Sequence, residues 1–283
     1  MMCSVKALRG FTMVEAVVVI AIAGIIAAML AVFIRQPVEA YIDTTRRAAL
    51  SELADTALRR LSRDLQAALP NSVRVVTTGG TTYLEFIPML GGARYRQFPT
   101  AGGSGDVLDF STTDGAVDLL GSVPLYAAGS SAVVFNLGPG SVSDAYAGNN
   151  RAVVTSSNVI DGLVSSDAAP HALSFNAFRF PSPSPAARIQ LVGTPVTYAC
   201  TPNAGDPAAG GLLRIDGYAF TAAQPTPPPG VGHLLAGQVA ECTVAYDPEV
   251  TRSRTGLVTL WLRLEDAGES VRLVHQMHVV NAP

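Results

Sequence analysis

Glu15 is the residue whose position most clearly calls for chemistry, because this carboxylate stands at the edge of a long uncharged segment. The run from Ala16 to Ile34 contains no charged residue. As a helix of about 19 residues, rising about 1.5 Å per residue, it would span roughly 28 Å, close to the hydrocarbon thickness of a bilayer. A charge at that edge costs on the order of 2.5 kcal/mol or more without a partner. We therefore expect Glu15 to have a functional partner.

The residues around this run allow three interpretations. The first is a single membrane anchor. The second is a secretory signal peptide, with Lys6 and Arg9 as its positive region. The run is longer than the roughly 7–15 apolar residues of a signal peptide. No small-x-small cleavage site follows it either, because Arg35, Gln36 and Pro37 close the run. The third interpretation depends on the residues that precede the run.

The string Gly10-Phe11-Thr12-Met13-Val14-Glu15, joined to the apolar run, resembles the processing site of type IV prepilins and type II secretion pseudopilins. In that family a short basic leader ends in glycine and a hydrophobic residue follows. The resemblance implies that a prepilin peptidase cuts between Gly10 and Phe11, and that Phe11 becomes the N-methylated mature terminus. It also implies that Glu15 meets the terminal amine of a neighbouring subunit. Such a pair gains more in apolar surroundings than in water.

Under this interpretation residues 1–10 are the leader, and their charges predict an orientation. Lys6 and Arg9 have no acidic neighbours, which fits the positive-inside bias and places the amino terminus in the cytoplasm. Cys3 is removed with the leader. The resemblance implies a single-pass inner-membrane protein of a Gram-negative bacterium, with a periplasmic domain, which is later incorporated into a pilus at the cell surface.

Residues 11–69 are expected to form one long helix, with a transmembrane segment at about 14–34. Pro37 should kink or locally melt it near residues 33–36, and Pro70 should end it. In the second half, apolar residues recur at three- and four-residue steps, which predicts a stripe packed on a sheet of the same subunit rather than a coiled coil. Exposed ion pairs are expected between Asp55 and Arg59 and between Arg60 and Asp64. The stripe consists of Leu50, Leu53, Ala54, Ala57, Leu58, Leu61, Leu65, Ala68 and Leu69.

From residue 70 to 283 the pattern changes to short strands, which we interpret as one β-rich domain. Runs of Val, Leu, Phe and Tyr alternate with Gly, Pro, Ser and Asp. The fold class is therefore α+β, and the resemblance implies a type IV pilin-like fold with a long N-terminal helix packed on a β-rich C-terminal domain. A hairpin turn is expected at residues 265–270. The expected strands are Ser72–Thr77, Thr82–Pro88, Arg94–Phe98, Val107–Phe110, Ala132–Leu137, Ala152–Thr155, His171–Phe180, Arg188–Val192, Val196–Cys200, Leu212–Phe220, Cys242–Tyr246, Gly256–Glu265 and Val271–Val280.

Two cysteines remain after processing, Cys200 and Cys242. In an oxidising compartment beyond the membrane, two such residues pair more often than not. The bond would close a loop of about 40 residues and contribute on the order of 4 kcal/mol. The alternative is two unpaired buried thiols. Zinc is not expected, because neither cysteine has a CxxC partner or a neighbouring histidine.

No catalytic constellation is found, so we do not expect an enzyme, a cofactor or a metal site. His275 and His278 are three apart on an expected strand, so they point to opposite faces and cannot share a metal. The acids at 106, 109, 114 and 118 do not match an EF-hand, and we interpret them as turn residues rather than calcium ligands. The 283 residues are 14% charged with a net charge of −3, which does not favour a nucleic-acid surface.

Short stretches along the chain resemble one branch of the pilin family, the minor pilin-like subunit of mannose-sensitive haemagglutinin (MSHA) pilus biogenesis. That branch implies a non-enzymatic subunit that primes or caps a pilus at low copy number. Its partners would be other minor and major pilins, the prepilin peptidase and the inner-membrane assembly platform. The alternatives are a J-type minor pseudopilin of type II secretion and a pilus-tip adhesin or binding module. The stretches are residues 63–65, 68–74, 84–88, 92–96, 134–138, 196–200 and 274–283.

Overall fold

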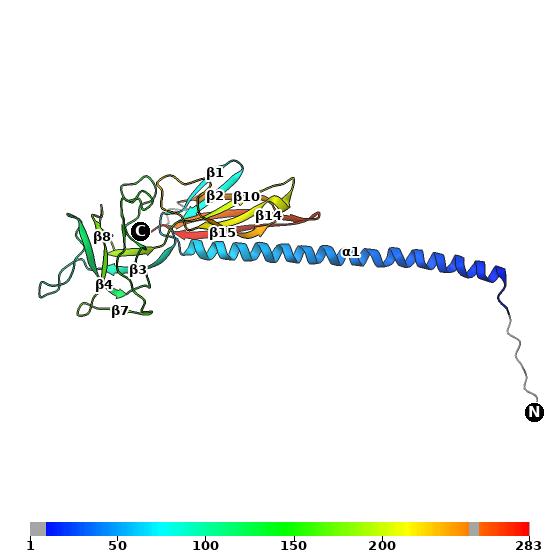
Figure 1. The fold of residues 1–283 in the computed structure, drawn as a ribbon, viewed down its shortest axis with the longest axis horizontal. Helices are drawn as coiled ribbons and strands as arrows, with labels where there is room; N and C mark the ends of the chain where they lie inside the picture. The colour runs from blue at the N-terminus through cyan, green and yellow to red at the C-terminus, as the bar shows by residue number, and fades with distance from the viewer. Residues whose placement is uncertain (1–9, 249–254, 283) are drawn as a thin grey trace, which may run out of the picture. The chain divides into compact units, whose positions relative to one another are not determined.

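The computed structural model describes residues 10–248 and 255–282, in which one α-helix is followed by antiparallel strands (Figure 1). The expected leader, with Lys6, Arg9 and Cys3, lies outside the described residues apart from Gly10. By contact density the chain divides into a part up to Ala49 and a compact part from Leu50 onward. The helix is α1 (Met13–Gln66), and a short 3-10 helix is η1 (Pro207–Ala209). The α+β class and the long N-terminal helix are confirmed.

The strands from Leu50 onward form three antiparallel sheets. The five-stranded sheet has the order β1-β2-β10-β11-β12, and the three-stranded sheet has the order β13-β14-β15. The seven-stranded sheet has the order β6-β5-β9-β3-β4-β7, with β8 also paired to β4. The bounds are β1 (Arg74–Thr78), β2 (Thr81–Phe86), β3 (Met89–Tyr95), β4 (Asp114–Ser122), β5 (Ser131–Val134), β6 (Arg151–Val153), β7 (Val164–Ser165), β8 (His171–Phe178), β9 (Arg188–Val192), β10 (Val196–Thr201), β11 (Gly211–Asp216), β12 (Val231–Gly237), β13 (Val239–Asp247), β14 (Thr255–Asp266) and β15 (Glu269–Val280).

The helix α1 differs from expectation in two places. It is continuous through Pro37, so the expected local melting is wrong. Proline removes its own N–H donor and its ring crowds the carbonyl four residues earlier, but the backbone on either side of Pro37 stays helical. The helix ends at Gln66 rather than at residue 69. Leu69 instead donates its N–H to the Ile87 carbonyl, and Ala67 accepts from the Met89 N–H, so the last turn is replaced by contacts with the chain around β2 and β3.

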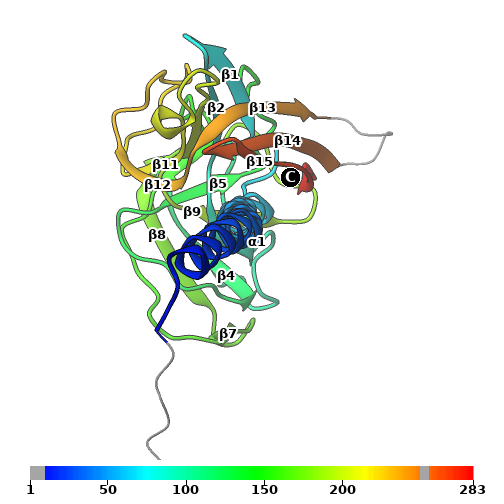
Figure 2. The ribbon, with the colours of Figure 1, turned by 90° about the vertical axis from the view of Figure 1, so that its right-hand side faces the viewer.

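The apolar stripe of α1 packs as predicted, against sheets of the same chain. Leu61 and Leu65 are at most 1% exposed and share one core with residues of the five-stranded and three-stranded sheets. Figure 2 shows β13, β14 and β15 side by side, with β11 and β12 nearby. Asp55 and Arg59 form the expected pair at 2.7 Å. Asp64, by contrast, accepts hydrogen bonds from Tyr198 and Arg214.

A long insertion separates β2 from its neighbour β10. These strands pair antiparallel, with Phe86 opposite Val196, yet residues 87–195 lie between them in sequence. The pairing resumes where Met89 of β3 stands opposite Val192 of β9, so the two strand pairs form one ribbon that runs from the five-stranded sheet into the seven-stranded sheet. The inserted strands enclose a second core around Leu119, and Figure 1 shows β3, β4, β7 and β8 as a group apart from β10, β14 and β15.

Several strand predictions were wrong. Val107–Phe110 is not a strand, and β3 lies mostly before the expected Arg94–Phe98. The strands β4, β7 and β12 were not expected. β4 begins with Asp114-Gly115 and contains Asp118, which is a turn-like composition, but Asp118 is buried and lies 3.0 Å from the Arg96 guanidinium. β12 is a largely exposed edge strand that lacks an alternating apolar pattern.

The hairpin between β14 and β15 is confirmed, with a tighter turn than expected. Only Ala267 and Gly268 separate the two strands, and both have positive φ angles, 48° and 87°. Two positive φ angles are the requirement of a type I′ turn, whose twist matches that of paired strands. The two-residue turn therefore fixes the register of β15 along its 12 residues.

We predict that Leu61→Ala lowers the free energy of unfolding by about 2–5 kcal/mol, because removing this buried side chain leaves a cavity between α1 and the sheets. The measurement is urea unfolding of the purified full chain in detergent. The control is Thr56→Ala on the exposed face of the same helix, which should change stability by less than about 0.5 kcal/mol. Equal effects of the two substitutions would contradict the packing described.

Candidate processing and assembly site

Gly10 and Phe11 lie just before α1, in a segment with no regular secondary structure. Both residues are exposed, and the Phe11 side chain is 69% exposed. A Cβ built on Gly10 would meet no atom within 4 Å. The fold therefore makes no demand for glycine at this position. An exposed, non-helical backbone is also what a peptidase needs at a bond that it cuts, and the Gly10–Phe11 bond has that geometry.

Thr12 caps the helix that follows, a role that the sequence analysis did not assign. The Glu15 N–H donates to the Thr12 hydroxyl at 3.3 Å, and the Ala16 N–H donates to the Thr12 carbonyl at 3.1 Å. Thr12 and Glu15 thus occupy the first and last positions of the capping-box pattern S/T-x-x-E, which was visible in the sequence. A carboxylate in the first turn also complements the helix dipole. Helix capping accounts for part of the sequence pattern at this site.

Glu15 has no partner for its charge within the described residues. No ion pair or side-chain hydrogen bond joins its carboxylate to residues 10–248 or 255–282, and the side chain is exposed. The neighbouring side chains Met13 and Val14 are apolar and 89% and 74% exposed. The structure brings Phe11 and Glu15 to the same end of α1, but capping engages only the Glu15 backbone and leaves the carboxylate available.

The helix behind this site has an apolar surface without protein cover. None of the most apolar 18-residue stretch of α1 is buried within the protein. Among the described residues, α1 is the helix long and apolar enough to cross a membrane. Exposing such a surface to water is unfavourable at about 25 cal/mol per Å². The first part of α1 therefore requires apolar surroundings, as in a bilayer or against other helices.

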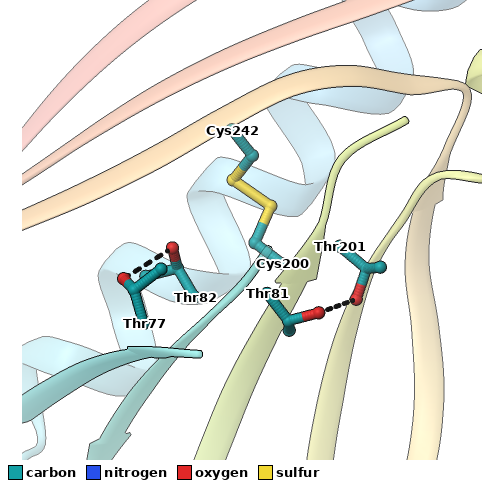
Figure 3. The surroundings of a disulfide bond; sticks show 6 residues. All are labelled: Thr77, Thr81, Thr82, Cys200, Thr201 and Cys242. Atoms are coloured by element: carbon teal, nitrogen blue, oxygen red, sulfur yellow. Dashed lines mark hydrogen bonds between the residues drawn. A yellow bond between two sulfur atoms is a disulfide. The ribbon is translucent and has the colours of Figure 1, made fainter. Parts of the chain in front are cut away.

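Cys200 of β10 and Cys242 of β13 form a disulfide, with the two sulfur atoms 2.00 Å apart (Figure 3). The strands belong to the five-stranded and three-stranded sheets, so the bond joins the two sheets that cover the stripe of α1. Both residues are at least nine-tenths buried. Two hydrogen-bonded threonine pairs lie near the disulfide, Thr77 with Thr82 and Thr81 with Thr201.

The other candidate ligands are dispersed or already engaged. His275 is half-buried and His278 is exposed on β15, on opposite faces as predicted. Hydrogen bonds from the hydroxyl and N–H groups that follow Asp109 lower the pKa of its carboxyl. Burial, followed by the charges of the neighbouring Asp114 and Asp118, raises the pKa of Asp106. Within residues 10–248 and 255–282, no three His, Cys, Asp or Glu side chains gather as metal ligands would.

Comparison with known protein families identifies the amino-terminal segment. Residues 6–31 match the prokaryotic N-terminal methylation motif, and this range contains Gly10, Phe11, Glu15 and most of the apolar run. The motif supports a type IV pilin-like or pseudopilin subunit, and together with the apolar helix it fits an inner-membrane anchored protein. Neither the curated proteins nor the solved structures that were compared contain a significant match.

We predict that a Cys200→Ala, Cys242→Ala double variant loses on the order of 4 kcal/mol of unfolding free energy, because the bond no longer restricts a loop of 42 residues in the unfolded chain. The measurement is denaturant unfolding with and without reductant. Reductant should lower the midpoint of the wild type and leave the double variant unchanged. A wild-type midpoint that does not respond to complete reduction would contradict this contribution.

Proposed function

We propose that this chain is a minor pilin-like structural subunit that is processed between Gly10 and Phe11, N-methylated at Phe11, and incorporated at low copy number to prime or cap a type IV filament. The observation that carries the proposal is the unpaired Glu15 carboxylate beside Phe11, at the start of an uncovered apolar helix. The matched methylation motif supports the same role. The role is structural rather than enzymatic.

The assembly step follows from electrostatics at the amino terminus. Cleavage after Gly10 creates a new ammonium group at Phe11, four residues before Glu15. In apolar surroundings a lone charge is costly, whereas an ammonium and a carboxylate in contact offset much of that cost. The hydrogen bond to Thr12 engages only the backbone N–H of Glu15 and leaves the carboxylate unpaired. The carboxylate can therefore form an ion pair with the terminal ammonium of a neighbouring subunit. The pair would fix the axial register between two helices.

Two features on opposite sides of the apolar run support a periplasmic location for the β-rich part of the chain. The positive residues Lys6 and Arg9 precede the run, which favours a cytoplasmic amino terminus. The disulfide between Cys200 and Cys242 suits an oxidising periplasm. We infer that the chain is an inner-membrane protein of a Gram-negative cell before it joins the filament, as the family resemblance implies. The helix continues without interruption from Met13 to Gln66, which favours a retained anchor over a removed signal peptide.

The finer assignment is to the MSHA branch of the pilin family. It depends on the sequence resemblance at residues 68–74, 84–88 and 274–283. In the structure the first and last of these segments meet, because the Asn71 N–H donates to the Asn281 side chain and α1 ends beside them. A J-type minor pseudopilin of type II secretion is the alternative within the family. The partners would be minor and major pilins, the prepilin peptidase and the assembly platform.

We predict that Glu15→Ala leaves membrane insertion unchanged and lowers incorporation into filaments at least about tenfold, since tenfold corresponds to a pair free energy of only about 1.4 kcal/mol. The measurement is quantitative immunoblotting of membranes and of sheared filaments from cells that lack the native chain. The matched control is Glu39→Ala, which removes an exposed carboxylate that pairs with Arg35 within the same helix. Normal incorporation of Glu15→Ala would refute the assembly role.

A further inference from the structure

A cavity of about 610 Å³ opens on one face of the seven-stranded sheet, beside the end of α1 and the residues that follow β15. Its lining includes Met89, Gly92 and Arg94 of β3, Leu120 of β4, and Arg188 and Gln190 of β9. A volume of this size falls in the range of ligand-binding cavities. None of these residues belongs to the amino-terminal site, so the cavity needs a separate explanation.

Two arginines stand directly opposite each other in this cavity. Arg94 of β3 pairs in register with Arg188 of β9, which places their Cβ atoms about 5 Å apart. Both side chains are exposed, and no ion pair with either is found among the described residues. Like charges in this position destabilise a sheet. Because the chain as a whole carries a net charge of −3, this is a locally positive site on an acidic protein.

Gln190 and Gly92 form the next pair along the same two strands. Gln190 lines the cavity and is 6% exposed, and its buried Oε1 has no hydrogen-bond partner. Such a group is costly unless a donor reaches it. Gly92 has no side chain, so the space across from Gln190 in the cavity is not filled. A Cβ at Gly92 would come no closer than 3.6 Å to its nearest neighbour, the Ile189 carbonyl oxygen, so neither packing nor backbone conformation requires glycine there.

A second hollow of about 490 Å³ adjoins the first and shares Arg94 and Leu120 with it. Its lining includes the exposed Phe98 and the proline residues Pro99 and Pro185. The two hollows together follow β3 from Met89 to beyond Tyr95, which is about 20 Å at about 3.3 Å per residue. This length suits an extended segment of roughly six residues. The two hollows together form a trough with Arg94 and Arg188 near its middle, and the second hollow is also lined by Asp167, which is paired with Arg96.

We propose that this trough binds an extended peptide segment of a partner protein, with an acidic side chain held between Arg94 and Arg188 and apolar side chains on Met89, Leu120 and Phe98. A carboxylate is opposite in charge to the guanidinium groups and fits their planar hydrogen-bond geometry. A peptide N–H supplies the donor that the Gln190 amide lacks, after a rotation of that amide. The proposal goes beyond the assembly role and does not depend on Glu15.

The test is selection of a phage-displayed random hexapeptide library on the purified full chain in detergent. We expect enrichment of one Asp or Glu flanked by apolar residues. Selected peptides, resynthesised with a fluorophore, should bind at least tenfold more weakly to an Arg94→Gln, Arg188→Gln double variant, and more weakly as salt is raised. Gly92→Leu should also block binding, by filling the cavity while both charges remain. The matched control is Arg179→Gln, an exposed arginine outside both hollows, which should bind normally.

Unfolding curves that match the wild type would show that the variants fold. No enrichment of acidic peptides, or enrichment that persists on the double variant, would overturn the proposal. Binding of glutarate alone, with the same dependence on Arg94 and Arg188 but without peptide enrichment, would assign the cavity to a small carboxylate and would also overturn it. Because the Glu15 carboxylate is intact throughout, failure here is distinguishable from failure of the assembly role.

Discussion

The burial of the stripe on the second half of α1 is the contact on which the rest of the structure depends. Leu61 and Leu65 pack in one core with residues of the five-stranded and three-stranded sheets. The disulfide between Cys200 and Cys242 joins the same two sheets, so a covalent bond and a hydrophobic core act at one place. This contact holds the second half of α1 against the sheets, whereas the most apolar stretch of the helix is not buried within the protein.

The inserted strands show how binding surface can be added without disturbing that core. Residues 87–195 leave the five-stranded sheet after β2 and return at β10, and the ribbon of β3 and β9 carries the pairing from one sheet to the other. A buried pair lies where the insertion leaves the sheet, because Arg74 of β1 is 2.6 Å from Glu85 of β2 and also stacks on Tyr146 of the insertion. Arg94 and Arg188 therefore sit on paired strands, whereas Phe98, Pro99 and Pro185 of the second hollow lie outside the strands.

Much of the fold could be predicted because its signals are local in sequence. The uncharged run, the apolar stripe with its period of about 3.6 residues and the alternating strands such as β9 can each be recognised from neighbouring residues alone. The rest depends on contacts distant in sequence. Asp118 looked like a turn residue because its buried partner, Arg96, is 22 residues away, and the end of α1 at Gln66 is set by Ile87 and Met89. At the candidate site Gly10, Phe11 and Glu15 came from a contiguous motif, whereas Arg94 and Arg188 meet only through sheet register.

The most direct test of the account is mass spectrometry of the amino terminus of the protein purified from its native membrane, with the prepilin peptidase present or deleted. The account predicts a chain that begins at Phe11 and carries one N-methyl group when the peptidase is present, and an unprocessed leader when it is absent. An intact Met1 or Met2 start in both strains would contradict it, and the chain would then be an ordinary membrane-anchored β-domain without the assembly role of Glu15.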